Sequence, residues 1–182
     1  MIKIDKVHSS VELIEKIIQK LKNFSRSSND HVSEPVYVKK LISDSVALAE
    51  LKAKETATVI STTGDSNPQI ACNEIEIEQV LLNLINNAID ATKDLKERWV
   101  EVSLQETADK VIIKITDAGA GTPKEIQASI FDPFYSTKPI GKGTGLGLSI
   151  TKGILKSHDA RIEVDSDSKN TCFILTFKKY KS

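Results

Sequence analysis

Residues 78–91 read EQVLLNLINNAIDA, and this segment decides the fold. Its apolar residues recur at steps of three and four, which predicts an amphipathic helix over residues 75–95. Asn83, Asn87 and Asp90 follow one another at i, i+4 and i+7, so their polar side chains lie along one line of this helix. We expect its buried face to contain Ile77, Val80, Leu81, Leu84, Ala88 and Ala91.

The two asparagines of this line are unusual for a solvated helix face. Lys and Glu are better helix formers than Asn and normally occupy such positions. An amide oxygen binds Mg²⁺ without neutralising it, which suits a site where the phosphates of a nucleotide already bring negative charge. Taken alone, the pattern also fits an ordinary solvated face.

Asp117 follows a predicted strand and precedes Gly119 and Gly121. Its carboxylate can accept a hydrogen bond from the exocyclic amino group of adenine, whereas guanine presents an oxygen there that a carboxylate repels. The glycines let the backbone pass close to a flat base. The same residues also fit an ordinary turn after a strand.

A glycine-rich loop follows at residues 141–148, which read GKGTGLGL, after the segment IFDPFYSTK at residues 130–138. Four glycines at alternate positions allow backbone amides to point at phosphates, beside the N-terminus of a helix predicted over residues 145–157. The loop is not a Walker A motif, because Lys142 is followed by Gly143. It also lacks the glycine spacing of a Rossmann motif.

The flanking segments mix strand and helix patterns without strict alternation. Strand patterns cover residues 36–38, 56–61 and 69–72, the last two joined by a turn at residues 64–68. A helix is predicted over residues 39–54, with inward-facing Leu41, Ile42, Val46, Ala49 and Leu51. A hairpin is predicted over residues 99–107 and 110–116, and two more strands over residues 161–164 and 171–178. This order predicts an α+β fold, a two-layer α/β sandwich with a mixed, largely antiparallel sheet.

The N-terminal segment carries a heptad pattern, which predicts a long amphipathic helix. Its apolar residues alternate steps of three and four, and they are Ile4, Val7, Val11, Ile14, Ile18 and Leu21. This regularity favours a helical dimer interface, and one helix packed on its own domain is the other interpretation. Polar residues 25–30 and then Pro35 end the helix, so we expect a first unit at residues 1–30 and a second at residues 31–182.

Composition excludes several classes of protein. The 182 residues carry 25 basic and 25 acidic side chains, so no net field favours nucleic acid or a membrane surface. No apolar run approaches the roughly 20 residues of a membrane span, and no secretory signal is evident, so we expect a cytoplasmic location. Cys72 and Cys172 lack the spacing of a zinc site or a disulfide framework.

In this order, the motifs resemble those of the catalytic ATP-binding domain of two-component sensor histidine kinases, over residues 34–177. That family has a Bergerat-type sandwich shared with gyrase, chaperone and mismatch-repair ATPases, and its motifs are the N box, two glycine boxes and the F box. The resemblance implies that Asn87 binds Mg²⁺, that Asp117 reads adenine and that Thr171 joins Asp117 through water. The ATP-binding residues it implies are Asn83, Asn87, Asp90, Asp117, Gly119, Gly121, Lys138, Gly143, Thr144, Gly145, Leu146, Gly147, Leu148 and Thr171.

The resemblance further implies transfer of the ATP γ-phosphoryl group to a histidine, for relay to a response regulator receiver domain. Related ATPases have a general-base Glu at the position of Asn83, and an amide cannot act as that base. A hydrolysing ATPase of the same superfamily, an anti-sigma-like serine kinase and a degenerate binding module remain alternatives.

Two departures from the family pattern concern charge. Many members have Lys where this chain has Asp90, so we expect Lys93, Lys138 or Lys142 to meet the phosphates. Asp159 replaces a common glycine at a helix end, where we expect it to adopt a left-handed conformation.

Residues 14–26 resemble the end of the second helix of the family's dimerisation hairpin, which implies a homodimer in the full-length protein. The acceptor histidine is expected upstream, because His8 lacks the family's acceptor motif. The sequence does not decide whether the full-length protein has a membrane anchor upstream of these residues.

Overall fold

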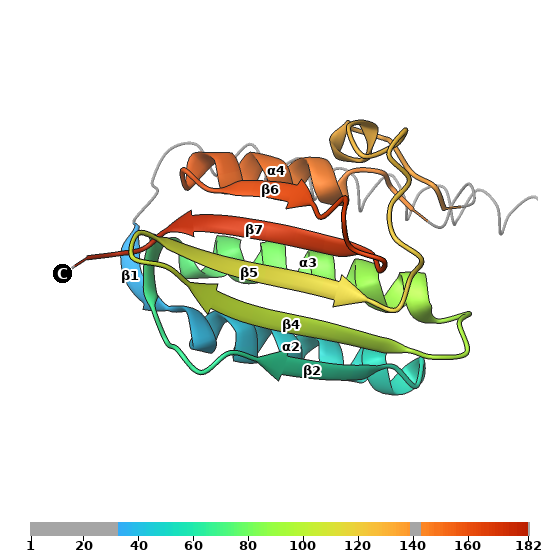
Figure 1. The fold of residues 1–182 in the computed structure, drawn as a ribbon, viewed down its shortest axis with the longest axis horizontal. Coiled ribbons are helices and arrows are strands. Elements are labelled where there is room, and N and C mark those ends of the chain that lie inside the picture. Colours follow the sequence, from blue (N-terminus) through green and yellow to red (C-terminus); the bar gives the residue numbers. More distant parts are fainter. Residues whose placement is uncertain (1–32, 139–142, 182) are drawn as a thin grey trace, which may run out of the picture.

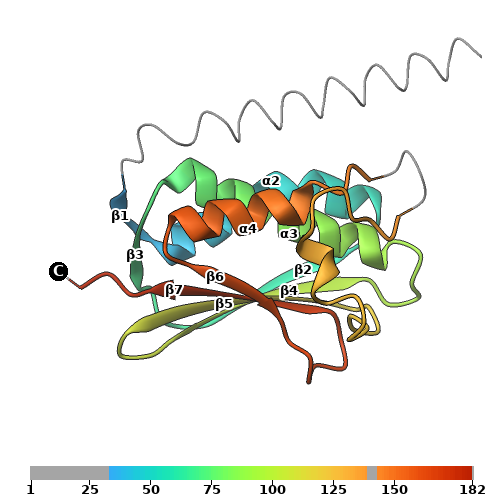
Figure 2. The same cartoon turned by 90° about the horizontal axis from the view of Figure 1, so that it is seen from above.

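The computed structural model describes residues 33–138 and 143–181, which form a sheet with three α-helices on one face (Figures 1 and 2). In chain order the elements are β1 (Glu34–Tyr37), α2 (Val38–Glu55), β2 (Val59–Thr63), β3 (Gln69–Cys72), α3 (Glu74–Thr92), β4 (Trp99–Glu106), β5 (Lys110–Asp117), the 3-10 turn η1 (Ser129–Phe131), α4 (Gly147–Ser157), β6 (Arg161–Val164) and β7 (Cys172–Lys178). The predicted N-terminal helix lies outside the described residues, and the division at residues 30 and 31 stays a prediction.

The main sheet has the strand order β2-β4-β5-β7-β6. β2 runs parallel to β4, and the other neighbours are antiparallel, which confirms the predicted α+β sandwich with its mixed sheet. Residues 64–68, where a turn was predicted, connect β2 to β3 with a single bend at Asp65, and these two strands do not pair with each other. β3 pairs with β1 in a separate two-stranded sheet, because the carbonyl of Pro68 accepts the Val38 N–H at 3.0 Å and holds the chain at the start of α2.

Strand alternation builds the sheet's contribution to the core. β5 shows a strict period of two, and its inward side chains are Val111, Ile113, Ile115 and Asp117. Each aliphatic side chain buried in this way contributes roughly 1.5–3 kcal/mol of transfer free energy. Asp117 therefore continues an apolar row at the end of its strand, and the fold buries its carboxylate.

The middle helix, α3, lies between α2 and α4 and is buried over a wide arc (Figure 1). The predicted inward residues are buried except Ala91, which is exposed because it faces the cavity described below. Ile85 and Ile89 are also fully buried, which the sequence pattern missed. On α2, Leu51 is 70% exposed, contrary to prediction, because the inward row continues from Ala49 by four residues to Ala53.

The helix ends follow local sequence signals. Asn73 caps α3, since its side-chain oxygen accepts the Glu76 N–H at 3.2 Å. Beyond the end of α4, Asp159 has φ of 53°, which confirms the predicted left-handed residue. The described part of the chain contains no helix that is both long and apolar enough to cross a membrane.

Candidate nucleotide site

A cavity of about 380 Å³ lies where α3 ends and α4 begins. In Figure 1 the amber segment between β5 and α4 lies at this end of the helix layer. Nine predicted site residues line the cavity, namely Asn83, Asn87, Asp90, Lys138, Gly143, Thr144, Gly145, Gly147 and Leu148. The other lining residues are Ala91, Ile130, Tyr135, Ser136, Thr137 and Phe173. The polar line of α3 and the glycine loop therefore face one space.

The two asparagines of α3 have different surroundings. Asn83 donates from Nδ2 to the buried Thr151 hydroxyl at 2.9 Å, so it is tied to α4. A Cβ added at Gly147 would lie 2.8 Å from Asn83 Oδ1, which shows how closely the start of α4 approaches. The Asn87 side chain lines the cavity and makes no hydrogen bond within residues 33–138 and 143–181. Its amide oxygen is thus available to a ligand.

Asp90 closes the polar line, and two lysines hold its carboxylate. Oδ1 lies 2.6 Å from Lys52 Nζ, and Oδ2 lies 2.7 Å from Lys138 Nζ. Burial alone would raise the pKa of Asp90, but the hydrogen bonds and charges of Lys138 and Lys52 outweigh burial, so the pKa lies below its ordinary value. Of the other two predicted phosphate cations, Lys93 is exposed and does not line the cavity, and Lys142 lies outside the described residues.

The glycine loop is hydrogen-bonded through its backbone to residues 130–138, here called the F-box segment because they resemble the F box of the family. The Phe134 N–H donates to the Gly145 carbonyl at 2.9 Å, and both residues have left-handed φ angles, 67° and 65°. A Cβ at Gly145 would lie 2.4 Å from the Phe134 carbonyl carbon, so this position accepts only glycine without a shift of the backbone. The ring of Phe134 remains exposed.

The N-terminus of α4 adds amide donors to the cavity wall. Gly147 and Leu148, its first two residues, line the cavity. Leu146 occupies the N-cap position and its side chain is buried and apolar, so it offers the first amides no acceptor. Such amides and the helix dipole together favour an anion.

Asp117, Gly119 and Thr171 form a second cluster, which does not line this cavity. Asp117 is 3% exposed, and its Oδ1 accepts the Gly119 N–H at 2.7 Å. A Cβ at Gly119 would lie 2.7 Å from both Asp117 Oδ1 and Thr171 Oγ1. Burial raises the pKa of Asp117 to about 6, although hydrogen bonds from Gly119 and Thr171 lower it in part. Backbone hydrogen bonds from Asp117 N–H to Thr171 and from Thr171 N–H to Gly119 fix the cluster.

One predicted residue, Gly121, and three residues that the sequence did not predict lie around the site and support it. Gly121 has φ of 85° on the loop that leaves the Asp117 cluster, and it does not line the cavity. Sequence reasoning missed Lys52, Thr151 and Asn170. Asn170 donates from Nδ2 to the Gly119 carbonyl at 3.2 Å, and so supports the glycine beside Asp117. None of these three residues belongs to a motif, since each acts through a contact between distant segments.

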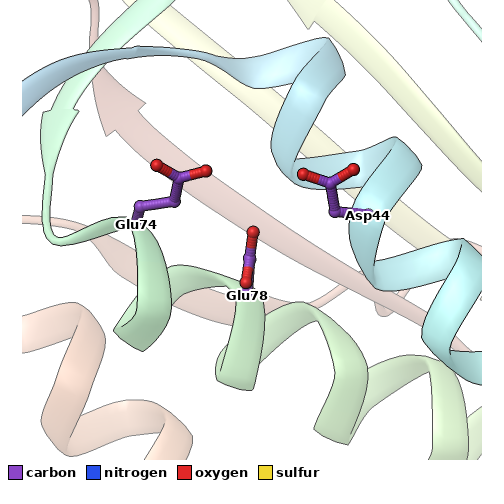
Figure 3. A group of neighbouring side chains, drawn as sticks. All are labelled: Asp44, Glu74 and Glu78. Atoms are coloured by element: carbon purple, nitrogen blue, oxygen red, sulfur yellow. The ribbon is translucent and has the colours of Figure 1, made fainter.

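A separate acidic group lies at the other end of α3 (Figure 3). Ligand oxygens of Asp44, Glu74 and Glu78 all lie within 4.8 Å of one another. Lys40 lies 3.1 Å from Asp44 and also pairs with Glu74, so a protein cation already occupies this group. Glu78 and Asn87 are separated by nine residues, or about 13 Å of helix, so the group is not part of the cavity.

Comparisons with known proteins agree with this geometry. The family of histidine kinase-, DNA gyrase B- and HSP90-like ATPases matches residues 72–181. Sporulation kinase A of Bacillus subtilis is 33% identical over 177 residues, which cover 96% of this chain and 28% of that protein. The adaptive-response sensory kinase SasA of Crocosphaera subtropica is 32% identical over 173 residues, which cover 93% of this chain and 45% of that protein.

Among solved structures, the nucleotide-free catalytic domain of histidine kinase ThkA superposes with a TM-score of 0.70 at 29% identity. The match covers 81% of this chain and 97% of the ThkA domain. The chain thus spans less than half of these two kinases but matches nearly all of the ThkA catalytic domain. It belongs to the histidine kinase-, DNA gyrase B- and HSP90-like ATPase family, and it carries the ATP-binding catalytic domain of a histidine kinase.

Proposed function

We propose that this domain binds ATP with Mg²⁺ and transfers the γ-phosphoryl group to a histidine on a dimerisation helix, for relay to a response regulator receiver domain. The composition of the cavity wall supports this proposal most strongly. The wall combines the amide of Asn87, which makes no hydrogen bond among the described residues, with the amides that begin α4. Asn83 stands where the resemblance to related ATPases implies a general-base Glu.

Asp117 is proposed to select adenine. A carboxylate accepts the exocyclic amino group of adenine and repels the oxygen that guanine presents there. The carboxylate is held by Gly119, so it needs no rearrangement to accept this bond. Thr171, beside Gly119, is proposed to join the same network through a water molecule.

Asn87 is proposed as the Mg²⁺ ligand. Mg²⁺ prefers oxygen ligands and usually keeps several waters while it contacts phosphates. The amide oxygen of Asn87 fits this role, because it faces the cavity and has no hydrogen-bond partner among the described residues. Bound Mg²⁺ would neutralise charge on the β- and γ-phosphates. Asp90 is not proposed as a ligand of the ion, since Lys52 holds its carboxylate from outside the cavity.

The phosphates are proposed to lie against the glycine loop and the start of α4. Gly143, Gly145 and Gly147 line the cavity from this side, so phosphate oxygens can approach the backbone closely. Lys138, whose side chain lies beside Gly143, supplies a positive charge to the cavity. Leu146 is buried and fixes the turn from loop to helix, so its proposed contribution is through its backbone.

Hydrolysis needs a group that accepts a proton from the attacking water. The candidates for this role among the described lining residues are poor bases, which favours transfer. Asn83 is an amide that already donates to Thr151. Asp90 is the one carboxylate among the described lining residues, and two lysines lower its pKa, which makes it a poor base. The γ-phosphoryl group should therefore persist until a histidine arrives. The partners proposed for this domain, a dimerisation helix and a receiver domain, follow from the family.

Calorimetric titration with ATP, with and without Mg²⁺, tests the proposal. Asp117→Ala should abolish measurable binding of both adenosine and ATP. Asn87→Ala should leave adenosine binding intact and remove the gain in ATP affinity that Mg²⁺ provides, about tenfold or more. Asn86→Ala is the matched control, since this neighbour on α3 does not line the cavity. Unchanged Mg·ATP affinity in the first two variants would refute the site.

A further inference from the structure

The carboxylate of Asp90 forms ion pairs with two lysines, although one lysine would balance its charge. Lys52 comes from α2 and contacts Oδ1, and Lys138 comes from the F-box side and contacts Oδ2. Both lysines keep about a third of their side chains exposed, so neither is locked by burial. A single carboxylate shared by two ammonium groups can lose one of them and still remain paired.

The two lysines differ in where they can move. Lys138 lines the cavity, and it is the one basic residue that does so in the described part of the chain. Lys52 does not line the cavity, and its Nζ also donates to the backbone carbonyl of Asn86 at 3.0 Å. Lys52 is therefore fixed to α3 from outside the site, while Lys138 can reach a ligand inside it.

Nucleotide phosphates would compete with Asp90 for Lys138. If Asp90 had no other partner, release of Lys138 would leave an unpaired carboxylate on the wall of a cavity that is filling with phosphate charge. Such a carboxylate would repel the phosphates and oppose the release. Lys52 removes this penalty, because it remains 2.6 Å from Oδ1.

We infer that Lys52 is a positioning residue for phosphate binding: it keeps Asp90 paired so that Lys138 can leave Asp90 and bind the nucleotide phosphates. The inference rests on the proposed function, since it requires phosphates in this cavity. It assigns Asp90 a different role from direct contact with ATP. Asp90 pairs with Lys138 in this structure and would yield it to the phosphates.

A double-mutant cycle at Lys52 and Asp90 tests this arrangement by calorimetry with ATP, ADP and adenosine. Lys52→Met should weaken ATP and ADP binding about tenfold and leave adenosine binding unchanged. Asp90→Asn should bind ATP at least as tightly as the wild type, because Lys138 is then no longer held by a carboxylate. The double variant should regain the affinity that Lys52→Met loses.

The matched control is Lys54→Met, which removes an exposed lysine of the same helix that pairs with Glu50. It should bind all three ligands like the wild type. The inference is overturned if Lys52→Met leaves ATP affinity unchanged, or if the double variant of Lys52→Met and Asp90→Asn fails to regain ATP affinity. Equal losses for ATP and adenosine would show a general structural role instead. Failure of the wild type to bind ATP would refute the proposed function itself, a result distinct from these.

Discussion

The proposed base end of the site, at Asp117, and the proposed phosphate end, at Asn87 and Asp90, differ in how far the protein satisfies its own polar groups. At the base end, Asp117 is buried and bonded to Gly119, and backbone hydrogen bonds tie it to Thr171. At the phosphate end, Asn87 has no hydrogen-bond partner in the described residues, and Asp90 has two cations. At the base end, the carboxylate already has hydrogen-bond partners within the protein. At the phosphate end, Asn87 can gain a partner and Asp90 can lose one of its two lysines when a ligand binds.

This difference follows from the elements that build each end. Asp117 belongs to the inward row of a central strand, where an unpaired polar group would be costly. The phosphate end is made of helix ends and a loop, where water can replace a missing partner. We therefore expect changes at the base end to act on folding as well as on binding. Changes at the phosphate end should act mainly on phosphate affinity.

The largest effect is expected from Asp117→Asn, which should change the pH dependence of the free energy of unfolding. Burial raises the pKa of Asp117 from its ordinary 3.8 to about 6, so the folded state holds this proton more tightly than the unfolded state. The contribution of Asp117 to the free energy of unfolding should thus be largest below about pH 4 and fall as pH rises to about 6, by on the order of 3 kcal/mol. Asparagine removes this titration and keeps an oxygen for Gly119.

Guanidinium unfolding at several pH values measures this effect. The stability of Asp117→Asn relative to wild type should rise between pH 4 and pH 6 and then stay constant. Parallel curves for the two proteins would show that the carboxylate is not destabilised by burial. In the same range, adenosine should bind the wild type more weakly as the pH falls below about 6, because the protonated carboxyl is a poorer acceptor.

A smaller effect is expected from Gly145→Ala at the phosphate end. The added Cβ meets the Phe134 backbone, and the left-handed φ of 65° costs alanine about 1–2 kcal/mol. ATP affinity should fall about tenfold or more, while adenosine affinity should not change. Gly147→Ala is the comparison, since Gly147 has no left-handed φ and its nearest contacts would be with the side chain of Asn83 and not with the backbone. Equal losses for adenosine and ATP in Gly145→Ala would remove the distinction between the two ends.

The smallest effect is expected from Thr151→Val. This change leaves the Nδ2 group of Asn83 without its acceptor, which should lower the free energy of unfolding by about 1 kcal/mol. ATP affinity should fall less than tenfold, because α4 keeps its packing. Thr151→Ser retains the hydroxyl but loses a buried methyl group, so it should bind ATP like the wild type and lose about 1 kcal/mol of stability through the methyl alone. Wild-type stability of Thr151→Val would contradict this prediction, because valine keeps the methyl group of threonine and lacks only the hydroxyl.

Sequence patterns predicted most of the architecture because they are local. The alternation in β4 and β5 indicated the hairpin, and the strand expected at residues 161–164 has the bounds of β6. The order of motifs also predicted which segments meet, as Asn87 and Gly145 do across the cavity. Such features depend on the period of a helix or strand and on glycine, whose requirements are visible in one segment.

Contacts between distant segments could not be predicted in this way. Lys52 reaches Asp90 only because α2 packs beside α3, and no feature of the α2 sequence distinguishes it from Lys54. The parallel pairing of β2 with β4 likewise depends on the whole sheet. The buried arc of α3 was placed too narrowly, because helices on both sides of it widen the arc beyond the pattern of a surface helix.

The central claim is that this site holds ATP for transfer to histidine. The direct measurement is to incubate the protein with Mg²⁺ and γ-labelled ATP, alone and with a separate dimerisation hairpin that carries its acceptor histidine. We expect no release of phosphate above background from the protein alone, and acid-labile label on the hairpin when it is added. Steady release of phosphate over many turnovers without any acceptor would contradict the claim.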